Sequence, residues 1–260
     1  MKTLAKFLFV CTAFTASNMF IGCSEDSTGT DNTPKRVIPK AGSTYTYTRT
    51  EKTPTGTTIA GTDTTHVVTS QSDFASFSGK DSVISFVDVN MMNSSATPDT
   101  TTIAYESNGD ISIYRGAGID ELPIALPITI PTWWQLPFKS KGTITIMNET
   151  PNLSFTIGIF TIVLESISGV ATGYANSENV SVAGQVFPCD KADVTFTITA
   201  KANGILPLSI VMKTTYLFNE SLGYFVSFDT QNTFPDIVIS QLGIDPGNNI
   251  QVLTGYNVKK

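Results

Sequence analysis

The stretch V-T-F-T-I-T-A-K-A-N-G-I-L-P-L-S-I-V-M-K-T-T-Y-L-F-N-E-S-L-G-Y-F-V-S-F, Val194 to Phe228, carries the clearest structural signal in the chain. Apolar residues alternate with threonines from Val194 to Ala200, and a second alternating run spans Leu208 to Phe218. A period of two is typical of strands that bury one face. Turn residues lie after each run, at Ala202–Gly204 and Asn219–Gly223. The stretch therefore predicts a meander of antiparallel hairpins.

Similar segments extend this pattern over most of the chain from Ser43 onward. They lie at Thr44–Thr50, His66–Thr69, Ser82–Val89, Thr101–Glu106, Ile111–Tyr114, Gly142–Met147 and Val180–Phe187. No helical stripe of useful length appears, although short helices fit at Ile119–Leu122 or Phe234–Leu242. We predict one antiparallel all-β domain, residues 43–260, with about ten to twelve strands. The expected shape is a strongly curved sheet or half-barrel, and a two-sheet β-sandwich is the alternative.

Two segments are less regular. Leu122–Phe138 contains four prolines, which forbid a continuous helix and a central strand, so an edge strand or an extended loop is expected. Gly142–Met147 is expected to pair with the strand that starts at Leu153. In that strand the apolar positions change face near Ile159-Phe160. A β-bulge would explain the change, and a strand buried on both faces is the alternative.

Composition limits the chemistry. The formal net charge is −6 and no basic stripe exists, which argues against nucleic-acid binding. The chain has one histidine, His66, which we interpret as a strand-face residue, and no recognisable catalytic, nucleotide-binding or zinc motif. We therefore expect no catalytic residue, no metal and no cofactor. Two weaker possibilities are a calcium site at Ile244–Asn249 and a carboxylate pair for glycoside hydrolysis, drawn from Asp81, Asp88, Asp110, Asp120, Glu121 and Glu165.

The N-terminus has the layout of a secretory signal. Lys2 and Lys6 precede the mostly apolar run Phe7–Ala16, and Phe20-Ile21-Gly22-Cys23 closes the segment. These closing residues resemble a bacterial lipobox, although Phe20 stands where leucine is usual. The resemblance implies that residues 1–22 are a lipoprotein signal peptide and that Cys23 is lipidated. A polar tether then follows in residues 23–42.

The resemblance also implies a location. Ser24 follows the cysteine, rather than the aspartate that retains lipoproteins in the inner membrane, so outer-membrane anchoring is expected. Glu25 and Asp26 resemble acidic surface-export signals, which leaves the periplasmic face and the cell surface both open. Cys11 leaves with the signal, so Cys189 remains alone, and we interpret it as a buried small side chain. Asp-Ser/Thr triplets such as Asp63-Thr64-Thr65 resemble an O-glycosylation signal.

The concave face of a curved sheet could hold an apolar ligand. Aromatic candidates for such a site are Trp133, Trp134, Phe138, Phe155, Phe160, Tyr216 and Phe218, with a plain hydrophobic core as the alternative reading. Because Trp133 and Trp134 are adjacent, they should face opposite ways in a strand. The lipobox and the meander together resemble half-barrel outer-membrane lipoproteins of the carrier and receptor type. Gly42–Tyr47 and Leu222–Val226 resemble strands of other lipoproteins that have no established activity, so this second resemblance implies no function.

Three functions remain open at this point. The first is a membrane-anchored protein that binds a hydrophobic ligand or lipid. The second is a structural or adhesive surface protein that binds glycan or protein through its loops. The third, a glycoside hydrolase, is disfavoured by the low charge content of 15% and the single histidine. A deep apolar cavity would favour the first, a flat aromatic platform the second, and a close carboxylate pair in a cleft the third.

Overall fold

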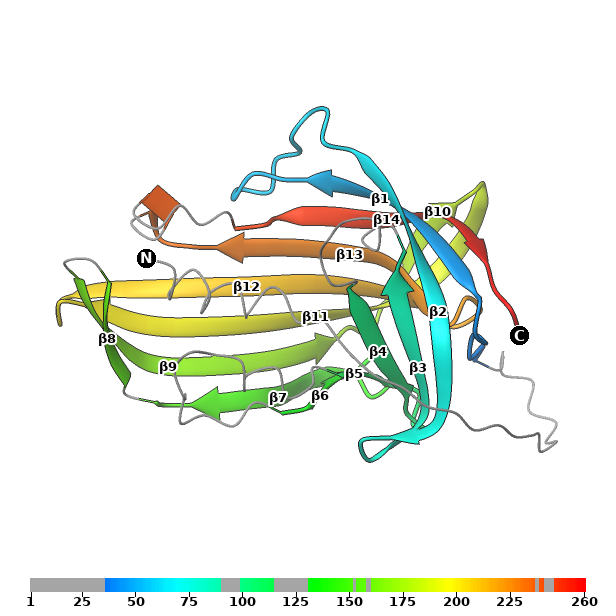
Figure 1. The fold of residues 1–260 in the computed structure, drawn as a ribbon, viewed down its shortest axis with the longest axis horizontal. Helices are drawn as coiled ribbons and strands as arrows, with labels where there is room; N and C mark the ends of the chain where they lie inside the picture. Colours follow the sequence, from blue (N-terminus) through cyan, green and yellow to red (C-terminus); the bar gives the residue numbers. More distant parts are fainter. Residues whose placement is uncertain are drawn as a thin grey trace.

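The computed structural model describes residues 36–89, 99–114, 131–151, 153–157, 160–236, 239–240 and 246–260. Fourteen strands lie in this part of the chain, and they form one antiparallel sheet (Figure 1). The strands are β1 (Thr44–Glu51), β2 (Thr64–Phe77), β3 (Lys80–Asp88), β4 (Thr100–Tyr105), β5 (Ile111–Tyr114), β6 (Trp133–Leu136), β7 (Gly142–Glu149), β8 (Leu153–Ile157), β9 (Phe160–Gly173), β10 (Glu178–Val182), β11 (Gln185–Ala202), β12 (Leu206–Asn219), β13 (Tyr224–Thr233) and β14 (Asn249–Asn257).

The sheet curls into a nearly closed barrel with one unsealed seam. Its strand order is β6-β5-β4-β3-β2-β1-β14-β13-β12-β11-β9-β7, so β6 and β7 form the two edges. The edges approach closely at one point, because a Cβ atom placed on Gly173 of β9 would collide with the carbonyl of Pro137, just after β6. The prediction of a strongly curved antiparallel meander is therefore confirmed, and the two-sheet sandwich is not the fold.

The hairpin that the sequence predicted most clearly is the longest among the strands that the structure describes. β11 and β12 pair without a shift from Asp190↔Phe218 to Ala202↔Leu206. Asn203 and Gly204 make the turn, both with positive φ, which asparagine and glycine tolerate best. β9, β11 and β12 extend well past the β2–β5 side of the barrel (Figure 1). One end of the barrel is thus prolonged by a few long strands.

Three sequence predictions about pairing were wrong. β7 does not pair with β8, because both lie along β9, at its two ends. The change of face near Ile159-Phe160 marks the end of one strand and the start of the next, since Ile157 of β8 lies opposite Phe160 of β9. Val180–Phe187, predicted as one strand, is a hairpin between β10 and the start of β11, and β11 then runs on through Pro188–Asp193 and changes partner from β10 to β9.

Other predictions are confirmed where the structure describes them. β6 is an edge strand, as the prolines of Leu122–Phe138 indicated, although 115–130 lie outside the described residues. A helical turn follows β13, where the Ile239 N–H donates to the Pro235 carbonyl at 3.2 Å. The possible helix at Ile119–Leu122 lies outside the described residues, as do the predicted signal peptide and Cys23.

The inner face of the barrel holds the main hydrophobic core. Tyr45 and Tyr47 of β1 are completely buried there, as their alternation with threonines predicted. On β11 the inward residues are Val194, Phe196 and Ile198, while the threonines between them point outward. The outward hydroxyls pair across strands, for example Ser166 with Thr199 at 2.6 Å. The alternating threonines of β1 and β11 therefore lie on the outside of the sheet.

Candidate functional site

One end of the barrel is closed by the hairpin turn between β12 and β13. Three inner-face tyrosines donate their hydroxyl hydrogens to backbone carbonyls of this hairpin. Tyr45 donates to Leu222 at 2.8 Å, Tyr105 to Gly223 at 2.6 Å and Tyr47 to Phe225 at 2.6 Å. Burial raises the pKa of all three tyrosines, so they stay neutral donors. We call this end, with the turn Asn219–Tyr224, the closed end.

The segment that precedes β1 covers the closed end from outside. The Val37 N–H donates to the Glu220 carbonyl at 2.9 Å. The Arg36 guanidinium donates to the Asp110 carbonyl at 3.1 Å and lies 5.3 Å from the ring centroid of Phe218. Gly223 has a φ of 65° and leaves no room for a Cβ atom, which would collide with the Val37 carbonyl. The closed end is therefore sealed by two separate pieces of chain.

Behind the closed end lies an aromatic floor of interlocking rings. Phe138 and Phe218 stack with centroids 5.4 Å apart, and Phe225 lies 5.8 Å from Phe218. Tyr216 lies 5.3 Å from Phe225 and 5.8 Å from Phe228. Such ring pairs add stability beyond the area that they bury. We call this group of five residues the aromatic floor.

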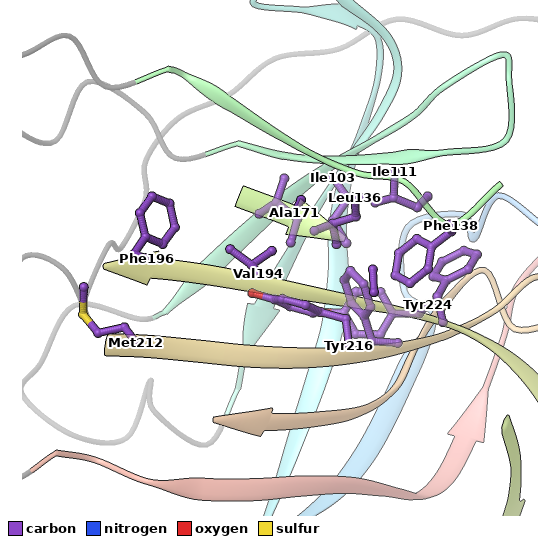
Figure 2. Close-up of a cluster of buried hydrophobic side chains, with 14 of the residues drawn as sticks. Ile103, Ile111, Leu136, Phe138, Ala171, Val194, Phe196, Met212, Tyr216 and Tyr224 are labelled. Carbon is purple, nitrogen blue, oxygen red and sulfur yellow. The ribbon is translucent and has the colours of Figure 1, made fainter. Parts of the chain in front are cut away.

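The long strands continue the apolar face beyond the aromatic floor. Pairing places Leu164, Ala200 and Leu208 in one row across β9, β11 and β12, and Phe196 beside Met212 in another. Figure 2 shows Phe196 and Met212 set apart from the rings around Tyr216 and Phe138. We call the inward side chains of this region the apolar lane, which comprises Leu153, Phe155, Phe160, Ile162, Leu164, Phe196, Ile198, Ala200, Leu208, Ile210 and Met212.

The lane differs from the floor in burial. Phe138, Phe218 and Phe225 of the floor are completely buried. In the lane, Leu153, Phe155, Phe160, Ile162 and Ile210 are only partly buried, as is Phe228 of the floor, whereas the other six lane side chains are buried. A partly exposed row of large apolar side chains on the inside of a curved sheet is a surface that an apolar molecule could cover.

The two tryptophans of β6 face opposite ways, as their adjacency predicted. Trp134 points inward, where its ring lies 4.4 Å from that of Phe196. Trp133 packs on the outer face with Phe77 and Tyr114, at 6.4 and 5.0 Å between centroids, and its indole N–H donates to the Ser78 carbonyl. The outer rings meet at interplanar angles of 80° and 62°. They form a packed cluster rather than a flat aromatic platform.

The structure thus separates the seven aromatic residues that the sequence singled out. Phe138, Tyr216 and Phe218 belong to the aromatic floor. Phe155 and Phe160 belong to the apolar lane, and Trp134 borders it through Phe196. Trp133 lies on the other face of the sheet. Ligand contact by any of them stays a prediction. Sequence reasoning did not single out the aliphatic residues of the lane. Those on β11 and β12 belong to the alternating apolar runs of the sequence, which could have identified them.

The titratable groups make structural contacts. His66 Nδ1 lies 2.6 Å from Asp88 Oδ2, and the His66 ring stacks on Tyr47 at 5.5 Å, so His66 is the strand-face residue that was expected. No group of three or more His, Cys, Asp or Glu that could hold a metal ion occurs among the residues described. In the proposed calcium loop, Asn248 Oδ1 accepts from the Asn232 N–H, and Asp245 lies outside the described residues.

Two buried carboxylates are saturated with hydrogen bonds. Asp110 accepts from Ser140, Lys139, Gln135 and Asn108, and Asp193 accepts from Tyr174, Thr215 and Lys213. Burial alone would raise the pKa of each carboxyl group, but these hydrogen bonds outweigh it and lower both pKa values. Carboxylates held in this way serve as structural anchors.

Cys189 is completely buried, and its thiol donates to the Phe187 carbonyl at 3.4 Å. Burial, together with Asp190 and Glu178, raises the pKa of the Cys189 thiol to about 12. A thiol with so high a pKa is a poor nucleophile. This agrees with the interpretation of Cys189 as a small core side chain.

Among the residues that the structure describes, no helix is long and apolar enough to cross a bilayer.

The sequence matches no protein-family model and no curated protein. Among solved structures, the chain is similar to a Bacteroides fragilis protein described as exported, with a YmcC-like fold. That match has 10% identity and a TM-score of 0.38, and covers 86% of this chain and 99% of the other. A Parabacteroides distasonis protein described as a lipoprotein matches with 11% identity and a TM-score of 0.41, covering 86% and 100%.

Proposed function

We propose that this protein is a membrane-anchored binding protein that holds an apolar ligand on its apolar lane. The observation that carries the proposal is the contrast between floor and lane. Three of the five floor rings are completely buried, whereas five lane side chains on the same inner face, Leu153, Phe155, Phe160, Ile162 and Ile210, keep part of their surface exposed. Covering such surface gains roughly 25 cal/mol for each Å² removed from water.

The proposed anchor is Cys23, after removal of residues 1–22 as a signal peptide. The support is in the sequence, where a small residue precedes the cysteine and a polar stretch follows it. Two or more acyl chains hold a protein stably in a bilayer. We place the protein at the outer membrane, because Ser24 follows the cysteine. Labelling with a radioactive fatty acid, compared between the wild type and Cys23→Ala, tests the anchor.

Binding rather than catalysis is proposed because three of the candidate carboxylates have structural partners. Glu165 forms an ion pair with Lys201 on the outer face, and Asp110 is enclosed by hydrogen-bond donors. Asp88 is held by the contact with His66. The partners of these three carboxylates all lie outside the apolar lane, so we assign them no acid–base role over it.

The test is to produce residues 24–260 as a soluble periplasmic protein and to analyse it by native and denaturing mass spectrometry. We expect an apolar molecule to copurify in near-stoichiometric amount. Ile210→Asp places a charge in the lane and should abolish this copurification. Ser209→Asp is the matched control, since Ser209 is exposed on the opposite face of β12. A clean ligand-free mass for the wild type would contradict the proposal.

A further inference from the structure

Beyond the buried Tyr47, the inner face of β1, β2 and β14 carries a row of polar side chains. Strand pairing places Thr64, Arg49 and Gln251 in one row across β2, β1 and β14. The same row continues through Phe228 and Tyr216 of the aromatic floor. Along this row the inner surface therefore changes from polar and charged side chains on β1 and β14 to aromatic rings on β13 and β12.

Arg49 is the cation of this polar side. It lies two residues after Tyr47 on β1, so both side chains point into the barrel. Its Nε atom is buried and lacks a hydrogen-bond partner in the described part of the chain. Glu51, on the same face of β1, is exposed and lies outside ion-pair distance of Arg49, as do the other described carboxylates. A buried guanidinium nitrogen without a partner costs free energy unless something binds it.

A second unpartnered atom lies next to it. His66 is opposite Tyr47, and thus one inward position along from Arg49. Asp88 Oδ2 is hydrogen-bonded to Nδ1 of the His66 ring, while Nε2 is buried and has no hydrogen-bond partner among the residues described. Arg49 and His66 therefore each present one buried nitrogen that the described residues leave unused.

We infer that Arg49, with His66 beside it, binds the anionic headgroup of an amphiphile whose apolar tail lies on the apolar lane. Arginine binds carboxylates and phosphates with two parallel hydrogen bonds, which suits such a headgroup. The inference rests on the proposed function and specifies its ligand class. A purely apolar ligand would leave the buried Arg49 nitrogen unsatisfied.

The dimensions of the sheet fit such a ligand. Arg49 on β1 and the lane on β11 are separated by β14, β13 and β12. Neighbouring strands lie about 4.8 Å apart and residues rise about 3.3 Å along a strand, so Arg49 and Met212, three spacings across and four residues along, are roughly 20 Å apart over the sheet. Phe228 and Tyr216 of the aromatic floor lie in the row of Arg49, and the lane begins four residues further along β12, at Met212. A tail of many carbons, rather than a short one, is needed to bridge this distance.

The test measures the binding of four probes with the same tail: hexadecanoate, hexadecyl phosphate, hexadecanol and hexadecane. Residues 24–260 with Trp133→Phe serve as the background, because Trp134 beside the lane is then the only tryptophan and reports binding by its fluorescence. Arg49→Gln removes the proposed headgroup contact. Lys201→Gln, on the outer face of β11, is the control with the same loss of charge. Thermal unfolding confirms that each variant is folded.

We expect the anionic probes to bind at least about tenfold more tightly than hexadecanol. The neutral alcohol cannot make the charge-assisted hydrogen bond to Arg49, and the loss of one such bond corresponds to about this factor in affinity. Arg49→Gln should abolish this preference and leave hexadecanol unchanged, whereas Lys201→Gln should change neither. The stronger of the two anionic probes identifies a carboxylate or a phosphate headgroup. Equal affinities for charged and neutral probes would overturn the headgroup site but keep the proposed function. If no probe binds, both fail.

Discussion

Asp110 shows how one buried carboxylate fastens three parts of the chain. It is completely buried and accepts from Asn108 in the β4–β5 turn, from Gln135 on β6, and from Lys139 and Ser140 before β7. Its position explains how the edge strands β6 and β7 are held near the rest of the barrel. Sequence reasoning placed Asp110 only among possible catalytic carboxylates, because a turn aspartate carries no sign of which distant donors will surround it.

Replacing this carboxylate should weaken the fold. Asp110→Asn keeps the size but puts an NH₂ group against donors, so we expect a loss of about 2–3 kcal/mol in the free energy of unfolding, measured with urea. Asp81→Asn is the control, because Asp81 is exposed on β3. Its effect should stay within about 0.5 kcal/mol. Equal effects of the two substitutions would contradict the anchoring role.

The lowered pKa of Asp110 also makes stability depend on pH. In the folded state the pKa of Asp110 lies below the ordinary value of 3.8. The unfolded chain therefore binds more protons than the folded chain in acid. The stabilisation is therefore complete above the unfolded value and is lost as the pH falls through the folded-state pKa. We expect the wild type to lose more stability than Asp110→Asn between about pH 5 and pH 3. Parallel pH profiles from urea unfolding would refute this.

Cys189 should be chemically silent in the folded protein. In residues 24–260 it is the only cysteine, which makes thiol counting unambiguous. Because burial raises its pKa to about 12, Ellman's reagent should detect no thiol in native protein and one per chain in guanidinium chloride. Rapid reaction of the native protein would show that Cys189 is accessible, against the burial described above.

At the scale of strands, sequence patterns succeeded where one face is buried and failed where the strand is irregular. β11 and β12 were predicted because Val194–Ala200 and Leu208–Phe218 alternate cleanly. β14 was missed because its register against β1 shifts, so that Leu253 and Gly255 pair with consecutive residues of β1. This bulge interrupts the alternation of apolar and polar residues along β14. The second half of β9 was missed because Gly169 and Gly173 replace apolar side chains where Phe196 and Pro137 approach. The apolar lane was only partly predictable, since pairing between distant strands creates it.

The seal on the closed end should depend on Gly223. Gly223→Ala combines an unfavourable positive φ with a collision against the Val37 carbonyl. Gly184→Ala is a matched control, because Gly184 has a φ of 82° with nothing close to a Cβ atom. The control should lose about 1–2 kcal/mol from backbone strain alone. Gly223→Ala should exceed this by at least about 1 kcal/mol in urea unfolding, and equal losses would show that residues 36–40 do not bear on the turn.

At the scale of the whole molecule, the path of the chain orients the barrel if Cys23 is the anchor. Residues 36–40 lie against the closed end, and the thirteen residues from Cys23 to Arg36 span at most roughly 45 Å. The turns at the two ends of β12 are separated by its fourteen residues, or about 45 Å. The closed end should therefore lie nearer the bilayer than the β11–β12 turn, and the apolar lane should extend away from the membrane.

This orientation is measurable on lipidated protein in vesicles that carry an acceptor dye in their headgroups. A donor dye is placed on Lys260→Cys, since the C-terminal residues pair with Lys40 at the closed end, or on Ile205→Cys, which is 85% exposed at the β11–β12 turn. Buried Cys189 should not react. Energy transfer should be stronger from position 260 than from position 205. The opposite ranking would mean that the lane faces the bilayer, and a ligand could then pass directly between the lane and the membrane. If the expected ranking is found, the lane faces away from the bilayer, and ligand exchange needs a soluble partner or one bound to another membrane.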